Sequence, residues 1–147
     1  MEDLKRGSIN YYRLGRKLEQ TYPAIAKELL VKLQPAFKNL DLIPHLYRIY
    51  QEIAEAPRST KEKTEFRTVF IMAITGLYDP ESLLGNKART TDGLRRKLSE
   101  VLDCLPTQVS YLYRNGRFFI SHYPKFARKV EDLRTRLSEY ATNVNKN

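Results

Sequence analysis

The chain has 147 residues, of which 41% are hydrophobic and 29% charged, with a net charge of +9 at pH 7. This composition is ordinary for a soluble globular protein. The single cysteine, Cys104, excludes an intrachain disulfide, and its place among apolar residues favours a buried thiol over a nucleophile. The longest apolar run, residues 69–77, is too short to span a bilayer, and no secretory signal is evident, so we expect a cytoplasmic protein.

The positive charge is unevenly distributed along the chain. Residues 1–84 contain 13 basic and 11 acidic residues, whereas residues 85–147 contain 13 basic and 6 acidic ones. Basic surface of this kind supplies the non-specific affinity of nucleic-acid-binding proteins. It serves equally for solubility or for contact with an acidic protein, so charge alone does not decide between these functions.

The N-terminal half of the chain has the spacing of apolar residues and prolines that predicts helices. The predicted spans are residues 9–20, 22–37, 42–56 and 61–78. Pro35 should end or bend the second helix, which is expected to turn four residues inward: Ile25, Leu29, Leu30 and Leu33. Pro44 suits the first turn of the third helix, and Ser59 or Thr60 should cap the fourth.

The predicted helix over residues 61–78 is apolar almost all round. Such a helix usually lies at the centre of a bundle, and the alternative is a dimer interface. The polar, basic residues 85–91 that follow the next turn either contact phosphates or form a solvated loop.

Two shorter helices are predicted over residues 94–102 and 106–115. The first places apolar residues on one face, namely Leu94, Leu98, Val101 and Leu102. Pro106 begins the second helix, which turns Val109, Leu112 and Tyr113 inward, and Asn115-Gly116 is a typical stop. Two short helices joined by a tight turn form a helix-turn-helix unit.

Residues 95–114 resemble the helix-turn-helix of phage repressors, Cro and LacI-type regulators. Ser99 stands where this motif has a small residue, and Val109 stands at the apolar slot of its second helix. Asp103 replaces the usual turn glycine, although Asp tolerates left-handed angles better than most residues. Leu105 replaces the usual Ser or Thr cap, a loss that typically costs about 1 kcal/mol.

The resemblance implies that the second helix lies in the major groove of DNA. The residues expected to face base edges are Thr107, Gln108, Ser110, Tyr111 and Arg114. The residues expected to contact phosphates are Lys87, Arg89, Arg95, Arg96, Lys97 and Arg117. Further along, Lys125, Arg128 and Lys129 are weaker candidates for the same role.

After Gly116 the sequence allows two structures. Residues 117–123 form either a wing or part of a helix, and helix is favoured because no second strand is visible to pair with. Residues 124–140 have good helical spacing, and residues 142–147 are expected to be disordered. The predicted fold is an all-α, multi-helix bundle. Residues 1–84 form its N-terminal region and residues 85–141 its basic region, unless the two form one integrated domain.

The function predicted from these patterns is that of a small protein of transcription regulation, or an accessory protein, that binds double-stranded DNA. A helix-turn-helix of this kind usually works as a dimer on paired half-sites, for which the helix over residues 61–78 or the last helix could supply the contact. No enzyme activity, cofactor or membrane association is expected. No metal is expected either, because neither His45 nor His122 has a Cys, His or carboxylate at the spacing of metal ligands. The alternative is a helical protein–protein adaptor or assembly protein in which the helix-turn-helix is purely structural. RNA binding ranks below DNA binding because the aromatic stacking motifs of common single-strand binders are absent from the sequence.

Overall fold

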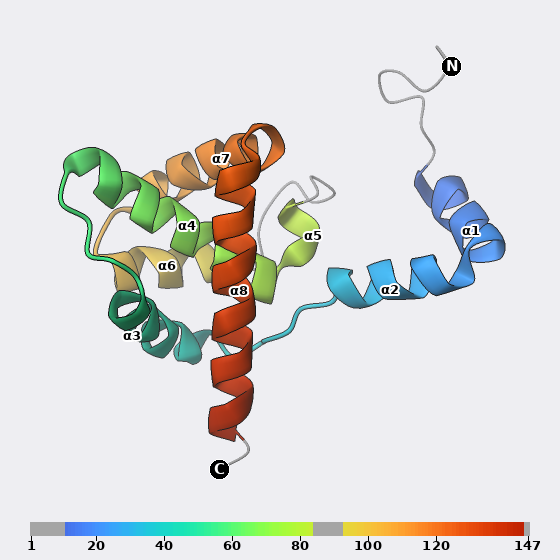
Figure 1. The fold of residues 1–147 in the computed structure, drawn as a ribbon, viewed down its shortest axis with the longest axis horizontal. Coiled ribbons are helices and arrows are strands. Elements are labelled where there is room, and N and C mark those ends of the chain that lie inside the picture. Colours follow the sequence, from blue (N-terminus) through green and yellow to red (C-terminus); the bar gives the residue numbers. More distant parts are fainter. Residues whose placement is uncertain (1–10, 84–92, 146–147) are drawn as a thin grey trace. The chain divides into compact units, whose positions relative to one another are not determined.

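The computed structural model describes residues 11–83 and 93–145 (Figure 1). These residues form helices and contain no strand, which confirms the predicted all-α class. The α-helices are α1 (Tyr11–Thr21), α2 (Pro23–Leu33), α3 (Ile43–Ile53), α4 (Thr60–Tyr78), α5 (Pro80–Leu83), α6 (Leu94–Leu102), α7 (Pro106–His122) and α8 (Pro124–Asn145). A short 3-10 helix, η2 (Leu40–Leu42), precedes α3. None of the described helices is both long and apolar enough to cross a membrane.

The chain divides into two compact units, Met1–Gln34 and Pro35–Asn147, which we call unit 1 and unit 2. Unit 1 contains α1 and α2, and unit 2 contains the remaining helices. The boundary that the sequence suggested at residue 84 therefore falls inside unit 2. The reason is that α3 and α4 contribute to the same hydrophobic core as α6, α7 and α8.

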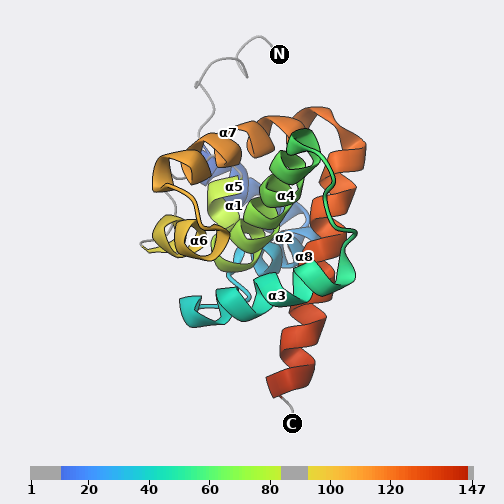
Figure 2. The same ribbon diagram turned by 90° about the vertical axis from the view of Figure 1, so that its left-hand side faces the viewer.

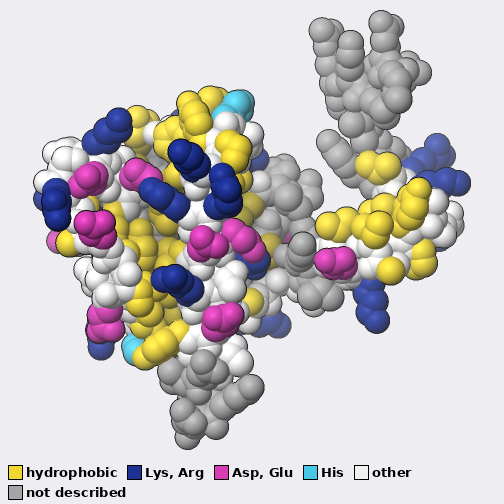
Figure 3. All heavy atoms as spheres, viewed as in Figure 1, with side chains coloured by type: hydrophobic (Ala, Val, Ile, Leu, Met, Phe, Trp, Pro, Cys, Tyr) yellow, Lys and Arg dark blue, Asp and Glu magenta, His cyan; other side chains and the backbone are white. Residues whose placement is uncertain are grey.

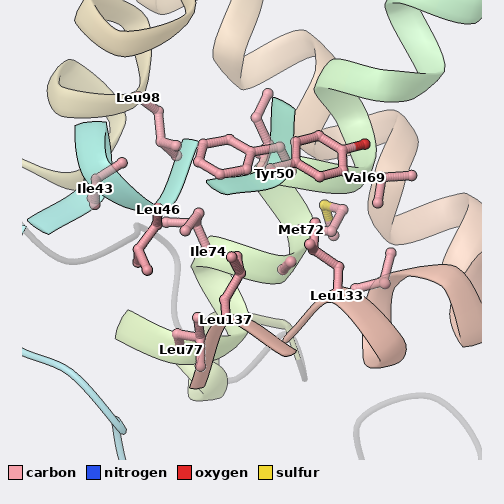
Figure 4. Close-up of a cluster of buried hydrophobic side chains, with 14 of the residues drawn as sticks. Ile43, Leu46, Tyr50, Val69, Met72, Ile74, Leu77, Leu98, Leu133 and Leu137 are labelled. Carbon is pink, nitrogen blue, oxygen red and sulfur yellow. The ribbon is translucent and has the colours of Figure 1, made fainter. Parts of the chain in front are cut away.

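Helix α4 is the centre of unit 2, as its apolar sequence predicted. Every residue from Thr68 to Tyr78 is buried, and α7 and α8 pack against this helix. The close-up in Figure 4 shows how the core is assembled: Ile43, Leu46 and Tyr50 come from α3, Leu98 from α6, and Leu133 and Leu137 from α8. Because α4 is enclosed by its own unit, its C-terminal half is not available as a dimer interface.

Local signals placed several helix ends correctly. The hydroxyl of Ser59 accepts a hydrogen bond of 3.1 Å from the backbone N–H of Glu62 and so caps α4. Pro44 lies in the first turn of α3. Helix α2 ends at Leu33, two residues before Pro35, which agrees with the expected break.

Two predictions about the two ends of the chain are wrong. Helix α8 continues to Asn145, so residues 142–145 are helical rather than disordered, because the buried Ala141 anchors the last turns on the core. In unit 1, Ile25 and Leu29 are exposed rather than turned inward, and the side chains of Leu30 and Leu33, predicted inward as well, are not among those described. The described part of unit 1 offers no core for them to enter, since none of the side chains of residues 12–29 is buried.

Candidate nucleic-acid interface

Helices α6 and α7 are joined by the three residues Asp103, Cys104 and Leu105. Asp103 adopts left-handed angles, φ 52° and ψ 54°, and is the one residue other than glycine in the described part of the chain with a positive φ. The backbone N–H of Cys104 donates to the carbonyl of Ser99 at 3.0 Å and closes the turn. The sharp turn expected at Asp103 is thus present, and Asp supplies the conformation that glycine would provide more easily.

The start of α7 lacks a side-chain cap, as predicted for Leu105. Gln108 supplies one of the two hydrogen bonds of a capping box, because its Oε1 accepts a hydrogen bond of 3.0 Å from the backbone N–H of Leu105. Pro106 occupies the first turn, where its missing N–H needs no partner. Gln108 is therefore exposed, but its side chain already stabilises the start of α7. The sequence had predicted that this side chain contacts base edges.

The inner face of α7 packs against the other helices of unit 2, chiefly α4 and α6. Val109 and Leu112 are buried, in agreement with the sequence prediction. Tyr113 is half-buried, and its hydroxyl donates to the carbonyl of Ser82 at 2.9 Å. These contacts fix which side of α7 faces outward. Figure 2 shows that the helix runs along the edge of unit 2, next to α4.

The predicted stop at Asn115-Gly116 is wrong, because α7 continues through Gly116 to His122. Gly116 is buried where α7 crosses α4, and a Cβ atom built there would lie 2.6 Å from Cγ of Met72 and 3.1 Å from Cγ2 of Thr68. This glycine permits a close approach of two helices instead of ending one. Residues 117–122 are consequently helical, which settles the choice between wing and helix in favour of helix.

The outward face of α7 is an unbroken stripe of exposed residues at spacings of three or four: Thr107, Tyr111, Arg114, Phe118 and His122. Tyr111 is 60% exposed and Phe118 is 51% exposed. The rings of Phe118 and His122 stack with their centroids 4.0 Å apart. The sequence prediction included only the first half of this outward stripe, because it placed the end of the helix at residue 115.

Helix α6 connects to the outward side of α7 through a side-chain hydrogen bond. The guanidinium of Arg95 donates to the hydroxyl of Ser110 at 2.8 Å. A residue expected to bind phosphate is thus joined to a residue expected to read bases. The bond fixes the two helices relative to each other and makes Ser110, which is half-buried, less available to a ligand.

The other predicted phosphate contacts lie in different environments. Arg96 is exposed on α6, whereas Lys97 is 24% exposed and pairs with Asp41 at 3.4 Å and Glu100 at 4.0 Å. The guanidinium of Arg117 lies 5.9 Å from the centre of the Tyr113 ring, an arrangement that permits a cation–π interaction. Lys87 and Arg89 lie outside the described residues.

Cys104 lies in the connection between α6 and α7 and is partly buried. Burial raises the pKa of its thiol, an effect that the positive charge of Arg67 opposes in part. A raised pKa lowers the fraction of thiolate at neutral pH, which is the nucleophilic form. This agrees with the interpretation of Cys104 as a packing residue.

A concave surface lies on unit 2, between the end of α3, α4 and α8. It is a groove of about 570 Å³ whose floor is apolar and includes Tyr50, Phe66 and Leu133. Figure 3 shows hydrophobic side chains bordered by charged ones on this face of the unit. Ion pairs occupy part of the border, among them Lys129 with Glu65 at 2.7 Å.

Comparison with the known protein families, with curated proteins and with solved structures finds no match to this chain. Any function assigned to α6 and α7 therefore depends on their own geometry and chemistry.

Proposed function

We propose that unit 2 binds duplex DNA through α6 and α7, with α7 as the second helix of a helix-turn-helix. The observation that supports this most directly is the two-sided character of α7. Its inner face packs on α4 and α6 and buries Val109, Leu112 and Gly116, while its outer face exposes Thr107, Tyr111 and Arg114, followed by Phe118 and His122. A helix that reads base edges in the major groove needs both properties.

Three residues are best placed to read bases. Thr107, Tyr111 and Arg114 are exposed on the outward face in the first half of α7, the part of such a helix that contacts base edges. Arg114 offers a fork of donors that suits guanine. Gln108 and Ser110 are assigned a secondary role in base contacts, because each side chain would first have to leave its present hydrogen-bond partner.

Phosphate binding is assigned first to Arg96 and after it to Arg95 and Arg117. All three are basic residues of the two helices, and contacts of this kind set the position of the protein on the duplex without reading its sequence. Lys97 contributes less, since two carboxylates already surround its ammonium group. The resulting protein would have a regulatory or accessory role on DNA.

The proposal predicts that Arg114→Ala weakens binding to the best duplex selected from a random pool by about 5- to 150-fold, the equivalent of about 1–3 kcal/mol. The matched control is Arg48→Ala, which removes the same exposed charge from α3, at the opposite end of unit 2 from α7 (Figure 2). Fluorescence anisotropy with labelled duplex measures both affinities. Equal affinity of Arg114→Ala and the parent protein would overturn the assignment, provided that both melt at the same temperature.

The groove between α3, α4 and α8 favours a second candidate function, that of a protein–protein adaptor. Its apolar floor and charged border resemble the surfaces on which amphipathic helices dock. In that case α6 and α7 would be structural, and binding to DNA would be absent or unaffected by Arg114→Ala. The same titration therefore separates the two functions.

A further inference from the structure

Aromatic rings gather where α7 ends and α8 begins, beyond the residues proposed to read bases. Phe118 is 51% exposed, Tyr123 is 53% exposed, and His122 between them is exposed as well. In Figure 3 hydrophobic side chains lie at this corner, at the top of unit 2, with Lys and Arg side chains below them. Single exposed apolar residues are common, but a contiguous group of them marks a binding site. We call Phe118, His122 and Tyr123 the aromatic corner.

The rings of the aromatic corner are held in place by their neighbours. The Phe118 and His122 rings stack with their centroids 4.0 Å apart and their planes 18° apart. The Nδ1–H of His122 donates to the carbonyl of Phe118 at 2.9 Å, which orients the imidazole. Tyr123 packs against Phe119 with ring centroids 5.8 Å apart, and Phe119 packs against the buried Phe126 at 5.4 Å. Rings that are already ordered lose little conformational entropy when a ligand stacks on them.

The aromatic corner lies within a stretch of chain that contains no acidic residue. Residues 104–130 include no aspartate or glutamate, but three arginines and two lysines. Two of these cations, Lys125 and Arg128, are exposed at the start of α8 and pair with no carboxylate among the described residues. Lys129 pairs with Glu65 of α4 at 2.7 Å. A polyanion is therefore the partner whose charge complements this surface.

Aromatic rings beside unpaired cations suit a nucleic acid whose bases are not paired. An unpaired base can stack on an aromatic side chain through its own π-face, whatever its identity. The lysine and arginine side chains then neutralise the adjoining phosphates. An intact duplex offers the phosphates alone, because neighbouring base pairs cover the faces of its bases. It would leave the rings of the aromatic corner without a partner.

The aromatic corner also continues the surface proposed to bind duplex DNA. Phe118 follows Arg114 by about one turn on the same outward stripe, and His122 follows Phe118 by about another. At a rise of about 1.5 Å per residue, Phe118 lies about 6 Å beyond Arg114 along α7, roughly the length of two stacked base pairs. Unpaired bases that adjoin a duplex bound at Arg114 are thus within reach of these rings.

We propose that the aromatic corner stacks unpaired bases next to the duplex held by α6 and α7, so that the ligand is a junction between double-stranded and single-stranded DNA. This inference rests on the proposed function, because α6 and α7 supply the contacts to the duplex arm. Phe118 stacks on an unpaired base, and Lys125 and Arg128 bind the phosphates of the unpaired strand.

The test compares three labelled DNAs by fluorescence anisotropy: a blunt duplex, the same duplex with an extension of about four unpaired nucleotides, and the same duplex with an abasic extension. The abasic extension keeps the phosphates and removes the bases, so the comparison isolates stacking. The parent protein should bind the extension with bases about 5- to 150-fold more tightly than the abasic one, the range for one stacked base. Equal affinity for the two extensions, in both strand polarities, would overturn the proposal.

Substitutions at Phe118 test whether its ring is the cause. Phe118→Leu should abolish the preference for bases, because leucine keeps an apolar side chain but has no π-face, whereas Phe118→Tyr should retain it. A leucine variant that keeps the preference, or a tyrosine variant that loses it, would overturn the role of the ring. Thermal unfolding monitored by circular dichroism checks that each variant is folded.

The matched control is Tyr140→Leu, near the other end of α8. Tyr140 is 40% exposed and packs against His45 with ring centroids 5.8 Å apart, so it is a second exposed aromatic residue beside a histidine. This control should prefer the extension with bases as strongly as the parent protein does. Loss of the preference in the control would overturn the assignment to the aromatic corner.

The proposed function and this inference fail in different ways. If α6 and α7 do not bind duplex, Arg114→Ala leaves the affinity for the blunt duplex unchanged. If only the aromatic corner is wrongly assigned, Arg114→Ala weakens binding to all three DNAs, while Phe118→Leu leaves the ratios among them unchanged. A parent protein that binds phosphatidylserine vesicles and shows no preference for unpaired bases would overturn the inference and assign the corner to a membrane surface.

Discussion

Asp103 shows how a single residue sets the geometry of the proposed interface. Its left-handed backbone is what allows α6 and α7 to be joined by three residues. We expect Asp103→Val to destabilise the protein by more than about 1–2 kcal/mol, because a β-branched side chain clashes with the backbone in this region. Asp103→Gly should be tolerated. Urea unfolding of the two variants measures the difference, and equal stability would contradict the role given to this turn.

Tyr78 makes stability depend on pH in the alkaline range. Its hydroxyl donates to the carbonyl of Asn39 at 2.6 Å, and burial raises the pKa of Tyr78 to about 12. The folded state therefore favours the neutral phenol. The stability that this provides is complete below pH 10, where the phenol is also neutral in the unfolded chain, and is lost as the pH rises from 10 towards 12.

The expected result is that Tyr78→Phe, which cannot ionise, loses less stability than the parent protein between pH 10 and pH 12. At neutral pH the same variant should lose about 1 kcal/mol with its hydrogen bond. Urea unfolding at a series of pH values measures both effects. Burial also raises the pKa of Tyr50, so part of the alkaline decline should remain in the variant. Parallel pH profiles for the two proteins would show that Tyr78 does not contribute.

At the scale of elements, Gly116 determines how closely α7 can cross α4. Gly116→Ala should destabilise the protein by about 1–3 kcal/mol, because the added methyl group would overlap with Met72 and Thr68. The combination with Met72→Ala tests the cause, since a smaller side chain on α4 makes room for the methyl group. The double variant should therefore be more stable than the sum of the two single changes predicts. Strict additivity would mean that the close contact is not the reason.

The elements also show what the sequence can and cannot predict. Local signals such as Ser59, Pro44 and Pro106 act within a turn of where they stand, so the starts of their helices were predicted well. Asn115-Gly116 looked like a local stop, but the role of Gly116 depends on Met72, which is 44 positions away in the chain. That error also removed Phe118 and His122 from the predicted site.

At the scale of the whole molecule, self-association and DNA binding should reinforce each other. If two copies pair, as the helix-turn-helix resemblance implies, both α7 helices can contact one long duplex, and the second contact benefits from high effective concentration. The protein should then bind a duplex long enough for two copies about 100-fold more tightly than a duplex too short to hold two. Fluorescence anisotropy with the two labelled lengths measures the difference, and equal affinity for both would contradict the coupling.

The measurement that tests the central claim most directly is the salt dependence of binding to random duplex DNA, with single-stranded RNA as the comparison. Each phosphate contact contributes about −0.9 to the slope of log affinity against log salt concentration. Arg95, Arg96 and Arg117 together therefore predict a slope of about −3 for each copy, with weaker binding to RNA. Absence of duplex binding at low salt, a slope near zero, or tighter binding to single-stranded RNA would contradict the proposal that α6 and α7 form a duplex DNA interface.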